Sequence, residues 1–262
     1  MNYRHAFHAG NHADVLKHIT LVATLKHLMH KEPGITLIDT HAGAGLYRLD
    51  GDYAETSGEA AEGFLRLISP EKRALPPANN DKLAIKSIAE GLAPAIQDYL
   101  DLVASFNSKG SHRVYPGSPF LIQRLLRDRD KLKLFELHPT DFKSLSGNIE
   151  QLGVGRQVAV AREDGFEGLK TFLPPPARRA MVFCDPSYEI KTDYQRVAAM
   201  VADSLVRFAT GTYVVWYPII PRPQAHSLPR HLTNLARQSN RPWLHATLRI
   251  RSGAQRPEAV TG

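Results

Sequence analysis

The sequence predicts an α/β fold, a doubly wound and mainly parallel sheet that carries a small inserted helical subdomain. Short apolar runs alternate with amphipathic helical patterns along most of the 262 residues, and this alternation is typical of parallel sheets. Several of these runs end in an acidic residue, where parallel sheets usually bind ligands. Some ninety residues separate the first predicted strand from the second, which indicates an insertion between them.

Composition limits the class of protein. The chain is 43% hydrophobic, enough for a sizeable core, yet it has no apolar run near the ~20 residues of a membrane span. The start of the chain, Met1 to His5, lacks an apolar signal-peptide core, and the single cysteine, Cys184, excludes an intrachain disulfide framework. We therefore expect a cytoplasmic protein with no membrane partner. We also expect a monomer, which these features do not themselves determine.

The net charge of +7 is unevenly distributed. Residues 48–110 hold 7 basic and 10 acidic side chains, whereas residues 207–262 hold 8 arginines and one acid, Glu258. The planar guanidinium group suits contacts with phosphates and base edges, so nucleic acid is the favoured partner. A solvated basic surface is the alternative interpretation.

A helix is predicted after a polar, histidine-rich start. Asn11 is its expected N-cap, with Asp14 at capping-box spacing. His18 falls on the apolar face of this helix, whereas Lys17 points roughly the other way. Seven of the 12 histidines occur by residue 41, but their spacing matches no recognised zinc pattern, so we expect no metal. The apolar face comprises Val15, Ile19, Val22, Leu25 and Met29.

A buried strand over residues 35–38 ends at Asp39 and leads into a turn that contains His41 and ends at Gly45. Glycines in such a turn let the backbone approach a bound nucleoside, and the acid can reach polar groups there. No Walker A loop follows, which argues against a nucleoside triphosphatase.

The predicted insertion has two helical patterns, around 58–68 and 82–106, joined by a Pro/Asn-rich break at Pro76 to Asn80. The sheet domain continues after the insertion from about Tyr115, and Ser118 can start a helix that runs to about Arg127. The predicted organisation is therefore residues 1–47 and 113–251 for the sheet domain, 48–112 for the insertion, and 252–262 for a polar tail.

The alternation is regular after the insertion. Thr192 and Gln195 form a predicted capping box for one of the later helices. The predicted elements are, in order, a strand at 131–137 that contains Glu136, a helix at 140–151, a strand at 157–161 followed by Asp164, a helix at 166–173, a strand at 180–184 followed by Asp185, a helix after Thr192, a strand at 212–217, a basic helix at 224–238 and a strand at 244–251.

The four acids fit a nucleoside pocket with a methyl-transfer site. An acid after the second strand suits ribose hydroxyls, and one after the third can accept a hydrogen from an adenine amine. An adenine N6 amine is a poor nucleophile, but the Asp185 carboxylate and the Pro186 carbonyl could each accept one of its hydrogens as nitrogen attacks a sulfonium methyl. Tyr188 could stack on the extruded base. An ordinary strand followed by an Asp-Pro turn is the alternative.

Five segments carry a resemblance to a known family. They are Tyr-Arg-His-x-Phe-His-Ala-Gly-Asn-His-Ala-Asp-Val-Leu-Lys-His at 3–18, Asp-Thr-His-Ala-Gly-Ala-Gly at 39–45, Tyr-Pro-Gly-Ser-Pro at 115–119, Glu-Leu-His-Pro at 136–139 and Lys-Thr-Asp-Tyr-Gln at 191–195. Over roughly residues 3–250 the chain resembles the RlmJ family, bacterial S-adenosylmethionine-dependent methyltransferases that act on adenine N6 in 23S ribosomal RNA. The resemblance implies a class I, Rossmann-like methyltransferase fold.

The resemblance also implies roles for individual residues. Asp185 would be the catalytic residue and would contact the methyl donor as well, with Pro186 and Tyr188 beside it. Tyr3 would lie against donor and target adenine, and His5 and Lys17 would handle the substrate. The remaining residues implied to contact S-adenosylmethionine are His18, His41, Ser118, Glu136, Asp164 and Gly165.

Two features depart from the family's pattern. Ser187 stands where the family usually has proline, which makes the loop somewhat less rigid. The chain ends in the polar residues 252–262, expected to be disordered, where the family continues into a further strand, so the final strand of the sheet would be missing at a cost in stability. DNA adenine-N6 methylation and an RNA-binding relative without turnover remain as alternative functions.

Overall fold

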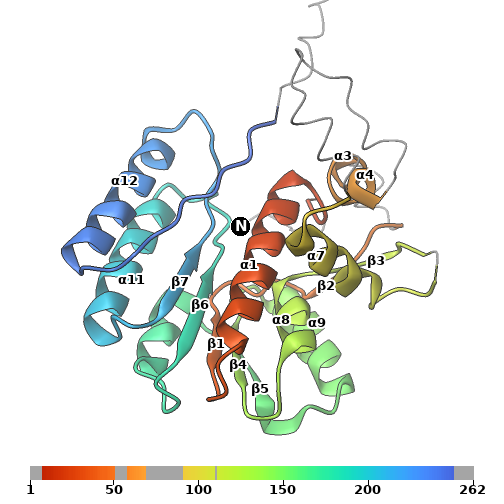
Figure 1. Cartoon of the computed structure of the whole chain (residues 1–262), viewed down its shortest axis with the longest axis horizontal. Helices are drawn as coiled ribbons and strands as arrows, with labels where there is room; N and C mark the ends of the chain where they lie inside the picture. The colour runs from red at the N-terminus through yellow and green to blue at the C-terminus, as the bar shows by residue number, and fades with distance from the viewer. Residues whose placement is uncertain (1–7, 51–57, 69–90, 110, 251–262) are drawn as a thin grey trace, which may run out of the picture.

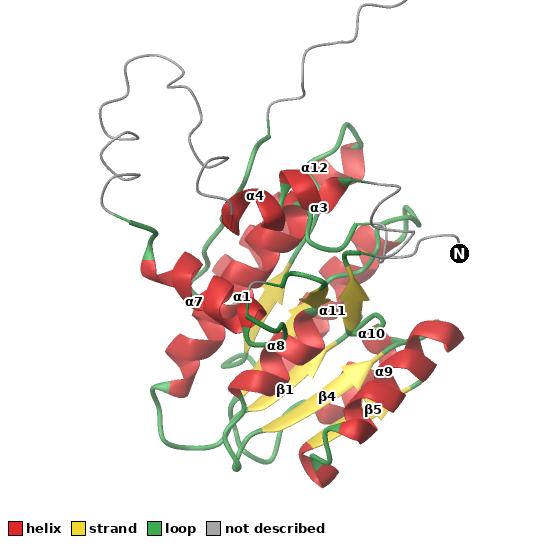
Figure 2. Ribbon diagram, turned by 90° about the vertical axis from the view of Figure 1, so that its right-hand side faces the viewer, coloured by secondary structure: helices red, strands yellow, loops and turns green. Residues whose placement is uncertain are grey.

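A single parallel sheet forms the centre of the computed structural model, which describes residues 8–50, 58–68, 91–109 and 111–250. The strand order is β5-β4-β1-β6-β7, and every neighbouring pair is parallel (Figures 1 and 2). The predicted doubly wound α/β fold is therefore confirmed. The strands are β1 (Thr36–Asp39), β4 (Lys131–Phe135), β5 (Val158–Ala161), β6 (Ala180–Cys184) and β7 (Thr212–Val215).

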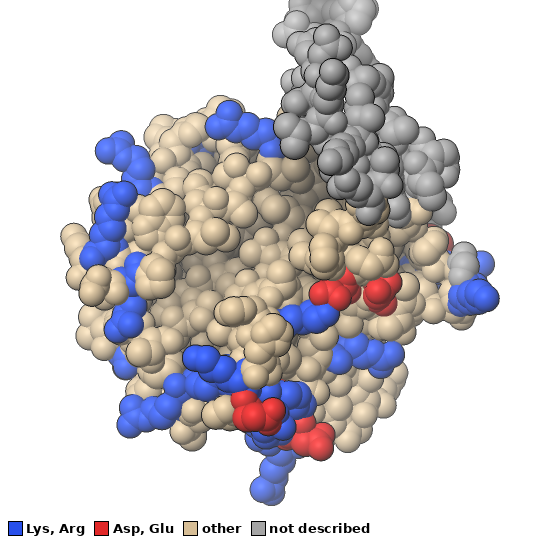
Figure 3. Space-filling model, viewed as in Figure 1, with Lys and Arg blue, Asp and Glu red and all other residues tan. Residues whose placement is uncertain are grey.

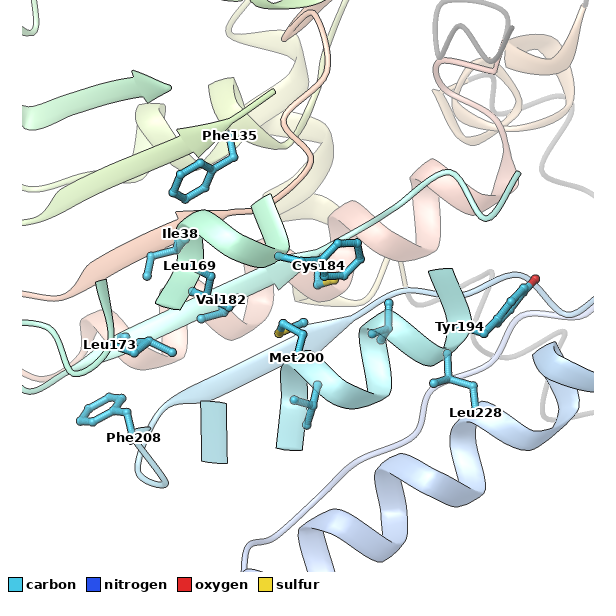
Figure 4. Close-up of a cluster of buried hydrophobic side chains, with 14 of the residues drawn as sticks. Ile38, Phe135, Leu169, Leu173, Val182, Cys184, Tyr194, Met200, Phe208 and Leu228 are labelled. Carbon is cyan, nitrogen blue, oxygen red and sulfur yellow. The ribbon is translucent and has the colours of Figure 1, made fainter. Parts of the chain in front are cut away.

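Helices cover both faces of the sheet, because alternate strand residues point to opposite faces. Leu37 of β1 packs toward α1, α8 and α9, whereas Ile38 packs toward α10, α11 and α12. Figure 4 shows the second of these cores, which contains Val182 of β6, Met200 of α11 and Leu228 of α12. The helices are α1 (His12–Met29), α8 (Ser118–Leu125), α9 (Pro139–Gln151), α10 (Gly165–Gly168), α11 (Asp193–Arg207) and α12 (Pro223–Gln238), with 3₁₀ turns η2 (Gly155–Gln157) and η3 (Leu169–Phe172).

The region between β1 and β4 forms a third packing unit against the amino-terminal part of α1. Its core contains Val15 of α1 together with Phe64 and Tyr99. The pattern around 58–68 is two short helices rather than one, because Gly63 lies against Gly10, where a Cβ would come within 2.2 Å of the Gly10 carbonyl oxygen. The described elements are β2 (Leu46–Arg48), β3 (Val114–Pro116), α3 (Glu59–Glu62), α4 (Phe64–Ile68) and α7 (Pro94–Ala104), and β2 and β3 pair antiparallel, which the sequence did not predict.

Two predictions about local structure are wrong. The side chain of Thr192 makes no capping hydrogen bond, since its backbone (φ −68°, ψ −19°) is already helical and an N-cap normally needs an extended backbone. No strand forms in residues 241–250, where Leu244 is 86% exposed. An isolated extended segment lacks the paired backbone that makes a strand, so its alternating apolar pattern has no sheet to bury it.

The N-cap of α1 is confirmed, because the Asn11 side chain accepts a hydrogen bond from the Asp14 backbone. The Pro76 to Asn80 break, the first part of the 82–106 pattern and the tail at 252–262 lie outside the described residues. Within the described part of the chain, no helix is long and apolar enough to cross a membrane.

Candidate active site

The predicted acids gather at one edge of the sheet. Asp39 is the last residue of β1, and Asp185 directly follows β6. Since β1 pairs in parallel with both β4 and β6, opposite Leu134 and Phe183 at its end, the carboxyl ends of the three strands coincide. Glu136 follows β4 and Asp164 lies between β5 and α10, so each predicted acid lies at or just after the carboxyl end of its strand.

Lys17 joins the two carboxylates that face it from different segments. Its Nζ lies 2.7 Å from Oδ1 of Asp14 and 2.5 Å from Oδ2 of Asp185. The side chains of Lys17 and Asp14 are only 4% and 1% exposed, whereas that of Asp185 is 15% exposed. Nζ also lies 5.4 Å from the centre of the Trp216 ring, which adds a cation–π contact.

The burial of Lys17 corrects the prediction that it points away from the packed face of its helix. Figure 1 shows α1 passing between the sheet and the α3–α7 region, so the helix packs on two sides. Burial by itself would lower the pKa of Lys17, but the charges of Asp14 and Asp185 outweigh it and raise the pKa, which keeps Lys17 protonated.

Asp39 is fully buried beneath this group. Its Oδ2 accepts a hydrogen bond from the Ser118 hydroxyl at 2.7 Å, and its Oδ1 accepts one from the His41 backbone at 3.2 Å. Burial raises the pKa of Asp39 to about 7, although both hydrogen bonds oppose the shift. Asp39 therefore changes charge near neutral pH, at the point where β1 enters the glycine-rich turn.

Glu136 ties the glycine-rich turn to the end of β4. Its two oxygens accept hydrogen bonds from the backbones of Gly43 and His138, each at 2.7 Å. Burial raises the pKa of Glu136. Gly43 has φ +63°, and a Cβ there would lie 2.4 Å from the Tyr47 hydroxyl, so the turn requires glycine at this position.

Asp164 and His41 lie at the far side of the same edge. Asp164 caps α10 through the Phe166 backbone at 3.0 Å and accepts a second hydrogen bond from Arg196 at 2.7 Å. Burial would raise the pKa of Asp164, but Arg196 outweighs it and lowers the pKa. The His41 ring meets Phe166 edge-on, and burial lowers the pKa of His41 to about 4. Next to Asp164, Gly165 packs so closely that a Cβ would lie 1.9 Å from the Thr40 carbonyl oxygen.

Tyr188 does not present the stacking face that the sequence predicted. Its backbone has φ +54°, and its ring is buried against Tyr194, with the centroids 4.5 Å apart. The Tyr188 hydroxyl donates a hydrogen bond to the Trp216 carbonyl at 2.6 Å. Both contacts turn the ring into the core of the α11 side, and Pro186 is buried as well.

His18 belongs to a buried polar chain rather than to the apolar face alone. Its Nδ1 lies 2.8 Å from the Tyr115 hydroxyl, which in turn lies 2.9 Å from the Tyr99 hydroxyl. Tyr3 and His5 lie outside the described residues.

Sequence reasoning missed three residues of this region: Asp14, Arg196 and Trp216. The i, i+3 spacing of Asp14 and Lys17 could have indicated an ion pair, but Asp14 was read only as a capping partner. Arg196 lies in α11 and Trp216 directly follows β7. Only the folded chain brings Arg196 close to Asp164 and Trp216 close to Lys17.

Three comparisons relate the chain to known proteins. A family model described as "Ribosomal RNA large subunit methyltransferase D, RlmJ" matches residues 32–261. The Ribosomal RNA large subunit methyltransferase J of Escherichia coli (strain K12) is 41% identical over 224 residues, which is 86% of this chain and 72% of that protein. The protein of the same name from Haemophilus influenzae is 40% identical over 225 residues, with the same shares covered. The crystal structure of protein LPL1258 from Legionella pneumophila has a TM-score of 0.72 and 32% identity, covering 87% of this chain and 76% of that one.

Proposed function

The chain belongs to the RlmJ family of ribosomal RNA large subunit methyltransferases, and from this premise we propose that it methylates N6 of an adenine in 23S ribosomal RNA with S-adenosylmethionine as the donor. The observation that carries the proposal is the Asp185 carboxylate, held by Lys17 and partly exposed at the carboxyl end of β6. Both curated relatives are named for ribosomal RNA, which favours RNA over DNA as the substrate and the cytoplasm as the site of action.

The residues at the strand ends suit the parts of the donor. Each Glu136 oxygen accepts one backbone hydrogen bond and keeps a lone pair for a ribose hydroxyl. Asp164, whose position is set by Arg196, can accept from the adenine amine of the donor. His41 is neutral at pH 7, so its ring adds no positive charge beside a sulfonium, while Asp39 and Ser118 offer oxygens to cationic groups. We include His18, Gly165 and Asp185 in this proposed donor site.

Asp185 holds the target amine. Lys17 occupies Oδ2 of the carboxylate, which leaves Oδ1 to accept one N6 hydrogen, while the Pro186 carbonyl is the proposed acceptor of the other. Two acceptors help the nitrogen become tetrahedral as its lone pair leaves the ring system. The bound donor supplies an electrophilic methyl on a sulfonium. When bound, S-adenosylmethionine would present that methyl to the N6 lone pair and its sulfur would keep the bonding electrons, while Asp185 would accept the proton that the amine releases.

The amino-terminal residues complete the proposed substrate site. We assign contacts with the target adenine to Tyr3 and contacts with the substrate to His5 and Lys17. Stacking by Tyr188 would require its ring to leave the contact with Tyr194, so we propose that Tyr188 holds the loop through Trp216 and does not cover the base.

The variant Asp185→Asn tests the proposal. We expect it to lower methyl transfer by at least about 100-fold, since a placed charged acceptor is worth this much. Donor binding should persist in calorimetry, because Asp185 is only one of several residues in the proposed donor site. The matched control is Asp203→Asn, which removes an exposed carboxylate paired with Arg207 on α11 and should keep full activity. Protein-free ribosomal RNA and duplex DNA are each offered with radiolabelled donor, and mass spectrometry identifies N6-methyladenine. Full activity of Asp185→Asn would refute the mechanism, and methylation of DNA alone would refute the substrate.

A further inference from the structure

The chain turns strongly basic from the last turn of α11 onward. Residues 204–250 contain six arginines and neither lysine nor any acidic residue. Surfaces of ordinary soluble proteins mix charges of both signs, so a long stretch of one sign indicates a polyanionic partner. The arginines are Arg207, Arg222, Arg230, Arg237, Arg241 and Arg249.

Part of this positive charge lies along one exposed face of the helix α12. Ala225 and Leu228 are buried against α11, and the exposed residues His226, Arg230 and Arg237 recur at intervals of four and seven on the opposite side. We call these three residues the arginine stripe. Arg230 and Arg237 are about 10 Å apart along the helix axis, at 1.5 Å per residue.

The arginines of the stripe have no acidic partner in the described part of the chain. The ion pairs of α11 use Arg196 and Arg207, while Arg230 and Arg237 make none with a described acid. A guanidinium that pairs with no described acid, on a helix that itself contains no acidic residue, is available to bind phosphate.

The helix α12, which carries the stripe, starts beside the proposed methyl-transfer site. Arg222, the N-cap of α12, donates a hydrogen bond at 3.1 Å to the carbonyl of Tyr188, three residues after Asp185. Figure 3 shows Lys and Arg side chains along the α12 margin of a face that is hollowed between α12 and α1. A strand of RNA with one base in the site could therefore continue along α12.

Exposed aromatic groups accompany the arginines. The Arg237 guanidinium lies 6.0 Å from the centre of the Trp243 ring, which is 51% exposed, and the Tyr217 and His245 rings stack at 5.9 Å. Aromatic rings beside arginines are typical of surfaces that bind single-stranded nucleic acid, where bases stack and phosphates pair with cations.

Resting on the proposed function, we infer that the arginine stripe of α12, with Trp243 beside it, binds the phosphate backbone of single-stranded RNA next to the target adenine. The double variant Arg230→Glu/Arg237→Glu tests this, with Lys131→Glu/Arg156→Glu as the matched control. Lys131 and Arg156 are exposed at the amino-terminal ends of β4 and β5, on the opposite edge of the sheet, and both double variants change the net charge equally.

The first measurement is the affinity for a fluorescein-labelled single-stranded RNA of about 20 nucleotides, enough to span an ordinary binding site, by anisotropy at several potassium chloride concentrations. We expect the stripe variant to bind at least about 10-fold more weakly at low salt. The magnitude of its slope of log K against log salt should fall by about 1.4, which corresponds to two lost phosphate contacts at about 0.7 each. The control should stay within about 2-fold of wild type, since only non-specific charge changes there. Arg230→Gln/Arg237→Gln, which adds no new charge, should show a smaller loss in the same direction.

The second measurement is methyl transfer to protein-free 23S ribosomal RNA. The stripe variant should raise the KM for RNA and leave kcat and donor affinity unchanged. If the stripe variant and the control have equal RNA affinity and equal salt slope, the proposed RNA-binding role of the stripe is refuted, even when the wild-type protein methylates RNA. A stripe variant that loses kcat at unchanged KM would also refute this role. If wild type methylates no RNA but the stripe variant still loses affinity, the proposed function fails and the stripe stands.

Discussion

Replacing Lys17 with methionine should cost a large part of the stability of the protein. Methionine fills a similar volume, but it removes the ammonium that lies 2.7 Å from the buried carboxylate of Asp14. Asp14 would keep the hydrogen bond from the Gly10 backbone at 2.9 Å but would lose the ammonium of Lys17. Removing one partner of a buried ion pair typically costs about 3–5 kcal/mol, and most of that cost is the charge left behind.

Asp185 should add little to this cost, because its side chain is 15% exposed and water can take over from Lys17. If Asp14 is the main source, Asp14→Asn in the Lys17→Met background should recover most of the lost stability. The neutral amide oxygen can still accept from Gly10, and the buried carboxylate charge at position 14 is gone. We expect the double variant to lie within about 1–2 kcal/mol of wild type.

Urea unfolding followed by circular dichroism at pH 7.5 measures these differences as shifts in midpoint at constant slope. The control is Lys26→Met on the same helix, where Lys26 pairs with Asp98 at 2.6 Å but both side chains are about 40% exposed. This exposed pair should be worth less than about 1 kcal/mol. A Lys17→Met loss no larger than that of Lys26→Met, or a double variant no more stable than Lys17→Met, would refute the reasoning.

Three further predictions concern Asp39 at the end of β1 and the glycines Gly165 and Gly147. Because the pKa of Asp39 is raised to about 7, its carboxylate form becomes populated as pH rises, so affinity for the cationic donor should increase about 10-fold from pH 6 to 8. Calorimetry should show this increase in wild type and a donor affinity independent of pH in Asp39→Asn. The same pH dependence in both proteins would contradict the prediction. The same raised pKa means that the stability contributed by protonated Asp39 is lost as pH rises from about 4 through about 7. Gly165→Ala should lower the free energy of unfolding by about 1–3 kcal/mol in thermal unfolding, since the new Cβ would meet the Thr40 carbonyl. Gly147→Ala, in open space on α9, should raise it by about 0.5–1 kcal/mol. Similar effects at both positions would argue against the close packing at Gly165.

Much of the architecture and the proposed site could be predicted from local sequence features. Short apolar runs bounded by glycine, proline or polar residues mark the strands β1, β4, β5, β6 and β7, and each run is readable without knowledge of the fold. The convergence of Asp39, Glu136 and Asp185 then needs only one geometric fact, that parallel strands end at the same edge.

The sequence could not reveal contacts that depend on more than one packing partner. A helical projection assigns Lys17 to the solvent side of α1, but α1 packs against the sheet on one side and the α3–α7 region on the other, which leaves Lys17 buried. Tyr188 likewise turns into the core because its backbone adopts φ +54° and its hydroxyl finds the Trp216 carbonyl.

Features that depend on neighbouring residues can be predicted from the sequence, whereas features that depend on distant residues need the folded structure. The order of the elements, the residues that end the strands and the arginine-rich charge of the last quarter can be predicted from the chain alone, because these are properties of neighbouring residues. Folding is needed to bring Lys17 between Asp14 and Asp185, to leave residues 241–250 without a sheet partner, and to place the start of α12 beside the candidate catalytic loop. Ion pairs and strand pairing depend on groups far apart in sequence, and their positions are set when the whole core packs.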